Sequence, residues 1–123
     1  MRHRRWINLC LRLTSKNNMP EYRHVSLLIK NGRVISYGFN NKYKAGRIAD
    51  PIYDCKGWHS EVDCLFSVHK RMVKGSILYN AAVTKTGKYA NSKPCPYCQQ
   101  FISKYDLKGV YYHDENGNVC KYA

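Results

Sequence analysis

The sequence predicts an α/β protein in which three helices pack on a five-stranded sheet. Two runs of strand-forming residues flank Asn31-Gly32, and this dipeptide between two such runs is the strongest short signal of a β-hairpin. Three other segments carry apolar residues at helical spacing. Strand and helix signals alternate in the second half of the chain, so the expected order of elements is α-β-β-α-β-α-β-β.

Length and composition indicate one domain over residues 1–123. The chain is 44% hydrophobic, which excludes a disordered protein, and no segment approaches the roughly 20 apolar residues of a membrane helix. Arg12 interrupts the apolar stretch near the N-terminus, so we expect no signal peptide and an intracellular, cytoplasmic chain with reduced thiols. The net charge of +13 favours nucleotides or nucleic acid as partners. Because no segment is long and apolar enough to span a bilayer, we expect no membrane partner.

The first half of the chain reads as a helix followed by the hairpin. The apolar stripe of the helix consists of Trp6, Leu9, Cys10 and Leu13. Pro20 lies beyond the end of this helix. The strands of the hairpin are expected over Tyr22–Lys30 and Arg33–Phe39. Residues 40–58 show no periodicity and are expected to form a loop.

The second half begins with a helix that Gly75 ends. Its expected apolar face consists of Val62, Leu65, Phe66, His69, Met72 and Val73, with His69 as a core histidine. A strand over Ser76–Val83 and a polar connection over Thr84–Lys93 follow. The next helix opens near Pro96 and turns inward Cys98, Phe101, Ile102 and Tyr105. Strands over Gly109–His113 and Val119–Tyr122 then pair antiparallel, because the turn between them reverses the chain at once.

Two short motifs at helix starts carry the chemistry. His59-Ser60-Glu61 opens one helix, and Pro94-Cys95-Pro96-Tyr97-Cys98 opens the next. Two thiolates and one imidazole suit tetrahedral zinc, and a helix N-terminus favours the thiolate form. Three protein ligands leave the fourth position open for water, which is typical of a catalytic rather than a structural zinc site. Glu61, in the same helical turn as His59, is placed to take and return a proton.

Two other interpretations remain open for these cysteines. A structural zinc knuckle needs a fourth protein ligand, which Cys55, Cys64 or Cys120 would supply, but it leaves Glu61 without a role. A thioredoxin-like redox pair matches the spacing of Cys95 and Cys98, but such a pair usually follows a strand, whereas a polar connection is expected here.

The combination of His-x-Glu with Pro-Cys-x-x-Cys resembles the cytidine/deoxycytidylate deaminase superfamily, and the likeness covers nearly the whole chain. It implies a three-layer α/β/α fold with a mixed five-stranded sheet and helices on both faces. It also implies zinc-dependent hydrolytic deamination of cytosine, or less readily adenine. By resemblance, His59, Cys95 and Cys98 hold Zn²⁺, Glu61 is the catalytic proton shuttle, and Asn40 binds the substrate.

Departures from the family pattern bear on the substrate. The family usually has Ala where this chain has Ser60, while a His ligand such as His59 is similar to the members that act on nucleotides or nucleic acid. Lys42, where nucleoside enzymes carry a Glu, suits a phosphate, as do Lys44 and Arg47 nearby. Tyr53 and Trp58 are candidates for stacking on a base.

Three hypotheses follow for the function. The favoured one is deamination of a free nucleotide such as dCMP, supported by the C-terminus, which is too short for the extra helix that nucleic-acid deaminases often insert. The alternative is deamination of cytosine, less readily adenine, in single-stranded DNA or RNA, that is, nucleic-acid editing. A catalytically idle zinc module that binds nucleic acid is third. Many members of the family that act on small substrates form homo-oligomers, so the resemblance also suggests a homo-oligomer for this chain.

Overall fold

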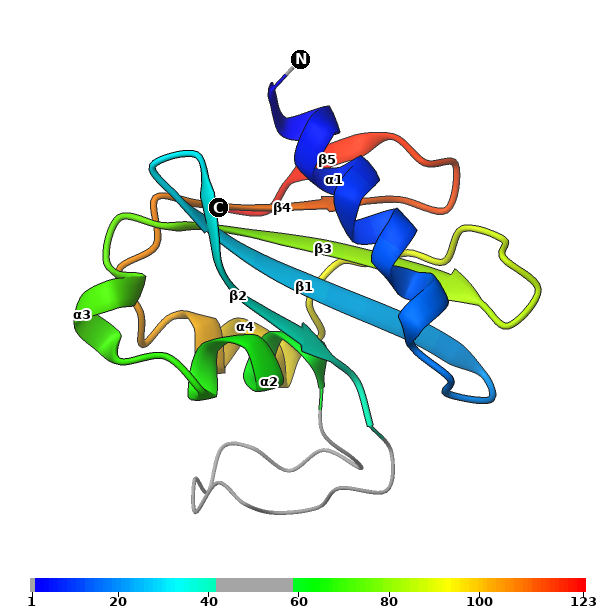
Figure 1. The fold of residues 1–123 in the computed structure, drawn as a ribbon, viewed down its shortest axis with the longest axis horizontal. Coiled ribbons are helices and arrows are strands. Elements are labelled where there is room, and N and C mark those ends of the chain that lie inside the picture. Colours follow the sequence, from blue (N-terminus) through cyan, green and yellow to red (C-terminus); the bar gives the residue numbers. More distant parts are fainter. Residues whose placement is uncertain (1, 42–58) are drawn as a thin grey trace.

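The computed structural model describes residues 2–41 and 59–123, and its centre is a five-stranded mixed sheet (Figure 1). The strand order across the sheet is β2-β1-β3-β4-β5. The strands are β1 (Tyr22–Lys30), β2 (Arg33–Phe39), β3 (Ile77–Thr84), β4 (Gly109–His113) and β5 (Val119–Lys121). Among these described residues, no helix has the length and apolar character needed to cross a bilayer.

Strand pairing confirms the expected mixed sheet. β1 lies antiparallel to both β2 and β3, β3 and β4 are parallel, and β4 and β5 are antiparallel. Asn31 and Gly32 both have positive φ angles, 53° and 73°. Two successive positive φ values are typical of the type I′ turn, whose twist matches that of the flanking strands. The predicted bounds of β1, β2 and β4 therefore agree with the structure.

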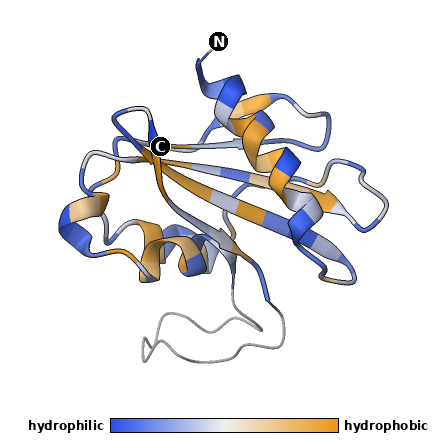
Figure 2. Cartoon of the chain, viewed as in Figure 1, coloured by the Kyte–Doolittle hydropathy of each residue, from blue (hydrophilic) through white to orange (hydrophobic). Residues whose placement is uncertain are grey.

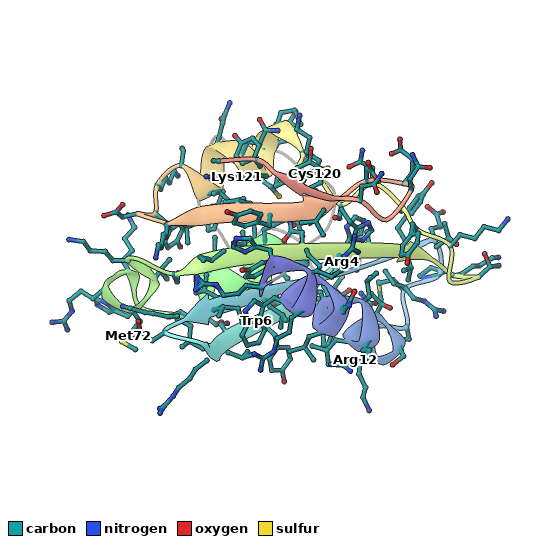
Figure 3. All side chains as sticks on the ribbon, turned by 90° about the horizontal axis from the view of Figure 1, so that it is seen from above. Arg4, Trp6, Arg12, Met72, Cys120 and Lys121 are labelled. Atoms are coloured by element: carbon teal, nitrogen blue, oxygen red, sulfur yellow. The ribbon has the colours of Figure 1, made fainter. Side chains whose placement is uncertain are left out.

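Helices cover both faces of the sheet, as the three-layer prediction requires (Figures 1 and 3). One face packs against α1 (Arg2–Leu13), which continues into the short 3₁₀ helix η1 (Thr14–Lys16). The other packs against α2 (Ser60–Phe66) and α4 (Pro96–Ile102). Each of these helices mixes hydrophobic and hydrophilic residues (Figure 2), and burying the apolar ones on the sheet is what stabilises helices of this length.

Two separate cores fill the spaces between the layers. The core under α1 contains Trp6, Ile7, Cys10, Leu27, Ile29, Tyr79 and Ala81. The core under α2 and α4 contains Leu28, Val62, Cys64, Leu65, Val73, Leu78, Cys98, Phe101, Ile102 and Val110. Adjacent residues of β1, such as Leu27 and Leu28, enter opposite cores because side chains alternate along a strand. The second core includes Cys98, so it also supports the candidate site.

The prediction of one continuous helix before Gly75 is wrong. The structure has two short helices there, α2 and α3 (Lys70–Val73), separated by residues 67–69. The Ser67 hydroxyl donates to the carbonyls of Asp63 and Cys64, and such bonds compete with helical hydrogen bonding. His69 is exposed instead of lying in the core, and its Nδ1 accepts a hydrogen bond from the backbone N–H of Arg71 at the start of α3.

The same break changes which apolar side chains are buried. Phe66 and Met72 were expected on the inner face, but each is about half exposed, whereas Val73 is fully buried. Tyr105, expected on the last helix, lies beyond the end of α4 and packs against the core from there.

His113, at the end of β4, is fully buried and fully hydrogen-bonded. Its Nε2 lies 3.0 Å from the backbone N–H of Ala82 and accepts from it, so Nδ1 carries the proton and donates to the carbonyl of Asp114 at 2.9 Å. Burial is the main cause that lowers the pKa of His113 below its ordinary value. The folded state therefore holds this ring neutral.

We expect His113 to make the fold less stable in mild acid. With a lowered folded pKa, its contribution is complete above the unfolded pKa of 6.5 and is lost as the pH falls below that value. Urea unfolding at several pH values would compare wild type with His113→Gln, which cannot take up a proton. Below about pH 6 the wild-type slope should be steeper by up to about 1.4 kcal/mol per pH unit. Burial, the main cause that lowers the pKa of His24, is common to both proteins, so equal slopes would contradict the assignment.

Candidate active site

The two motifs predicted from the sequence meet where α2 and α4 begin. His59 is the residue before α2, Cys95 is the residue before α4, and Cys98 lies in the first turn of α4. His59 Nδ1 is 3.2 Å from Cys98 Sγ and 3.6 Å from Cys95 Sγ. One donor atom from each of the three side chains lies within 4.8 Å of the others. Residues 36 and 39 positions apart thus converge on one point.

The electrostatics of this group favour a metal cation. Hydrogen bonding, first from Cys98 and then from His59, holds the pKa of Cys95 well below that of a free thiol. The same contact with Cys95 raises the pKa of His59, because the imidazolium is stabilised beside a thiolate. Two sulfur ligands and one imidazole nitrogen match the donor set of zinc. The residues present therefore fit this ion.

The alternatives for the two cysteines lose support. His59, Cys95 and Cys98 are called the three-ligand group below. Among the described residues, no fourth His, Cys, Asp or Glu lies close enough to join it. Cys64 is buried in the core, where burial raises the pKa of its thiol to about 12. Cys55 lies outside the described residues. No strand runs directly into Cys95, since residues 91–95 have no regular structure, so the redox-pair arrangement is absent there.

Glu61 lies beside this group and is almost completely buried. Its Oε1 accepts a hydrogen bond from Ser60 Oγ at 3.1 Å, and its Oε2 accepts one from Asn80 Nδ2 at 3.0 Å. Burial is the largest influence on this carboxyl group and raises its pKa, against the opposing charge of His59. A carboxyl group whose pKa is raised returns a proton more readily after taking one up, which is the property of a general acid–base.

The contact between β2 and α2 holds His59 and Glu61 in place. Gly38 of β2 lies directly against the backbone of α2, and a Cβ atom at this position would overlap Ser60 O and Cys64 N. One residue later, the backbone N–H of Phe39 donates to Asp63 Oδ2 at 3.0 Å. The close approach that glycine permits therefore fixes the start of α2 against the sheet.

Asn40, the predicted substrate-binding residue, has its side chain turned toward the backbone of β1. Its Oδ1 accepts from the N–H of His24 at 3.0 Å and from Asn17 Nδ2, and its Nδ2 donates to Tyr22 O at 3.1 Å. These bonds hold the carboxamide rigidly, so its substrate contact stays a prediction. The predicted phosphate contacts Lys42, Lys44 and Arg47 and the predicted stacking residues Tyr53 and Trp58 lie outside the described residues.

Sequence reasoning missed three polar residues near the site: His24 and Ser26 on β1 and Asn80 on β3. Ser26 and Asn80 are buried and connect to Glu61. Burial, followed by the positive charge of His59, lowers the pKa of His24 to about 4. His24, Ser26 and Leu28 alternate along β1 and so share the face that packs on α2. The sequence signal that could have found them is that this face of β1 changes from apolar at Leu28 to polar at Ser26 and His24.

The fold and the three-ligand group define a zinc-binding α/β protein with the architecture of a nucleobase deaminase. Over residues 1–114 the sequence matches the family described as "Cytidine and deoxycytidylate deaminase zinc-binding region". The chain therefore belongs to the cytidine and deoxycytidylate deaminase family, and zinc is its cofactor. No curated protein matches the sequence.

Solved structures share the fold. The dCMP deaminase from the cyanophage S-TIM5 in apo form is 21% identical, with a TM-score of 0.57 over 92% of this chain and 80% of that chain. The same enzyme in complex with dCMP and dUMP is 20% identical, with a TM-score of 0.65 over 89% and 79%. Form 2 of RibD from Acinetobacter baumannii is 15% identical, with a TM-score of 0.60 over 91% of this chain but 28% of that chain. At these identities the likeness concerns the fold.

Proposed function

We propose that this protein, as a single deaminase domain, hydrolytically deaminates the cytosine base of a free nucleotide, with dCMP as the favoured substrate. The observation that carries the proposal is the buried carboxyl group of Glu61 beside the three-ligand group of His59, Cys95 and Cys98. Membership of the cytidine and deoxycytidylate deaminase family supports the reaction type. The neighbouring phage structure that contains dCMP and dUMP supports the nucleotide.

In the proposed reaction, water replaces the amino group at carbon 4 of cytosine, giving uracil and ammonia. Zinc, when held by His59, Cys95 and Cys98, supplies the Lewis-acid activation of that water. The Glu61 carboxylate takes a proton from the water and delivers it to ring nitrogen 3. It then moves the second proton to the departing amine. A buried carboxyl group suits both transfers because burial favours its neutral form.

Two features favour a free nucleotide over a strand. β4 and β5 pair antiparallel through a short turn, an arrangement similar to that of small-substrate members of the family. The phage enzyme that was solved with dCMP and dUMP shares the fold over 89% of this chain. Asn40 at the end of the hairpin is the proposed contact to the sugar of the substrate.

The deciding experiment is a mass-spectrometric deamination assay on zinc-loaded protein. One tube contains dCMP, CMP and cytidine, and another contains a cytosine-bearing single strand; Glu61→Ala is the inactive control. We expect dCMP to be converted fastest, with little dependence on salt. Conversion of the strand alone, weakening steeply with salt because many phosphates are bound, would overturn the choice of substrate. No conversion of any cytosine compound would overturn the proposed reaction.

The zinc requirement has a matched pair of variants. Cys98→Ser removes a proposed ligand, so we expect it to lose both bound zinc and turnover. Cys120→Ser changes a half-buried thiol outside the three-ligand group, so we expect zinc content and turnover like those of wild type. Zinc content is measured by elemental analysis after dialysis. Zinc retained at wild-type level by Cys98→Ser would contradict the assigned ligand set.

A further inference from the structure

The Glu61 carboxyl group belongs to a ring of four buried polar side chains, each of which lies within hydrogen-bonding distance of the next. From Glu61 the ring passes to the Ser60 hydroxyl at 3.1 Å, to the Ser26 hydroxyl at 2.8 Å and to Asn80 Oδ1 at 2.7 Å. It returns from Asn80 Nδ2 to Glu61 at 3.0 Å. All four side chains are buried. The orientation of the Glu61 carboxyl group is therefore set by residues from α2, β1 and β3 together.

Asn80 is the best anchored member of this ring. It pairs with Ser26 across β1 and β3, so their side chains lie next to each other on the sheet face beneath α2. Asn80 Nδ2 also lies 3.4 Å from the carbonyl of Ser92, and the Ser92 hydroxyl donates to the Asn80 carbonyl at 3.1 Å. Ser92 lies three residues before Cys95. Asn80 thus connects Glu61 to the segment that delivers a zinc ligand.

The chemistry of the neighbours requires an amide at position 80. Its Nδ2 faces a carboxylate oxygen and a backbone carbonyl, both of which only accept hydrogen bonds. Its Oδ1 faces the hydroxyl of Ser26, which donates. Aspartate has nearly the same shape but no N–H, so it would place a second carboxylate against Glu61. Aspartate would therefore fit the space at position 80, but the hydrogen bonds donated by Nδ2 would be lost.

We propose that Asn80 is a positioning residue for the deamination reaction: it holds the Glu61 carboxyl group in the orientation needed for proton transfer. Asn80 is 2% exposed, so it acts through Glu61 without touching the substrate. The expected effect of Asn80 on kcat rests on the proposed function. The hydrogen bond itself is tested separately from catalysis.

The kinetic test compares zinc-loaded Asn80→Asp with Asn91→Asp. Asn91 undergoes the same chemical change, but its side chain is exposed and pairs with Glu115. We expect Asn80→Asp to lower kcat about 10²-fold, the loss typical of a displaced catalytic group, with KM within about twofold of wild type and zinc content unchanged. Asn91→Asp should match wild type. A kcat within threefold of wild type, or a fall in zinc content that accounts for the lost activity, would overturn the proposal.

The second readout is urea unfolding of four proteins: wild type, Asn80→Asp, Glu61→Gln and the double variant. In the double variant the amide introduced at position 61 can donate to the new carboxylate, which restores a hydrogen bond with its direction reversed. We therefore expect Asn80→Asp to lower the urea midpoint less in the Glu61→Gln background than in wild type. Equal losses in both backgrounds would show that the two side chains do not interact.

The outcomes of these tests are distinguishable. If wild type converts no cytosine compound, the proposed function fails, while the unfolding cycle still decides whether Asn80 holds Glu61. If wild type is active and Asn80→Asp is equally active, the positioning role fails alone. If Asn80→Asp does not fold, Asn80→Ala, which lacks the donor and adds no charge, takes its place in both tests, with the same expected loss of kcat.

Discussion

Glu61→Gln is expected to lose nearly all turnover while keeping zinc and the fold. The substitution removes the group that takes and returns protons, a contribution of about 10²- to 10⁴-fold in enzymes that use general acid–base catalysis. Glutamine has almost the same shape, and His59, Cys95 and Cys98 are unchanged. Steady-state kinetics and zinc analysis on the same preparation measure both effects. Turnover within tenfold of wild type would remove Glu61 from the reaction.

The same variant should be at least as stable as wild type to urea. Ser26 donates to Asn80 and Ser60 donates to the Glu61 carboxylate, so no hydrogen remains between the two serine oxygens, which are 2.8 Å apart. The glutamine amide supplies the missing donor to Ser60, which can then donate to Ser26 and complete the ring. One additional buried hydrogen bond contributes about 0.5–1.5 kcal/mol. A clear loss of stability would show that this account of the ring is wrong.

Gly38→Ala is the second change with a large expected effect. Its added methyl group would overlap Ser60 O and Cys64 N, which belong to the backbone of α2 and cannot rotate away. Overpacking of this kind costs about 1–3 kcal/mol, and here it also displaces the helix start that carries His59. We expect a lower melting temperature together with weaker zinc binding, measured by thermal unfolding and zinc titration.

Gly87→Ala is the matched control for Gly38→Ala. Gly87 has a φ of 85°, and an added Cβ there would meet nothing within 4 Å. It should cost only the backbone strain of a left-handed alanine, about 1 kcal/mol, and leave zinc binding unchanged. Equal zinc affinity in the two variants would contradict the positioning role of Gly38.

Local patterns predicted the strands well. The bounds of β2 follow from Asn31-Gly32 on one side and the loss of alternation after Phe39 on the other. The prediction of one helix before Gly75 was wrong although the apolar spacing continues across Ser67. The Ser67 hydroxyl donates to backbone carbonyls of the preceding turn, and α2 ends there. The periodicity of apolar residues carries no information about a side-chain hydroxyl that competes with backbone N–H groups for the same carbonyls.

The proposed zinc ligands and Glu61 could be proposed from sequence because short motifs carry them. Asn80 and Ser26 were not, because no local spacing relates two residues 54 positions apart. Only the register of β1 against β3 places them side by side. Polar residues that support a site from neighbouring strands become visible once that register is known.

The separation of the proposed zinc ligands along the chain has a consequence for folding. His59 and Cys98 are 39 residues apart, and the whole of β3 lies between them. Bringing together two points of a flexible chain that far apart costs about 3 kcal/mol of conformational entropy. The folded sheet has already met that cost, so we expect zinc to bind the folded chain far better than the unfolded one. We therefore expect metal concentration to shift the folding equilibrium of this protein, with zinc as a reversible cross-link between the segments that carry His59 and Cys98.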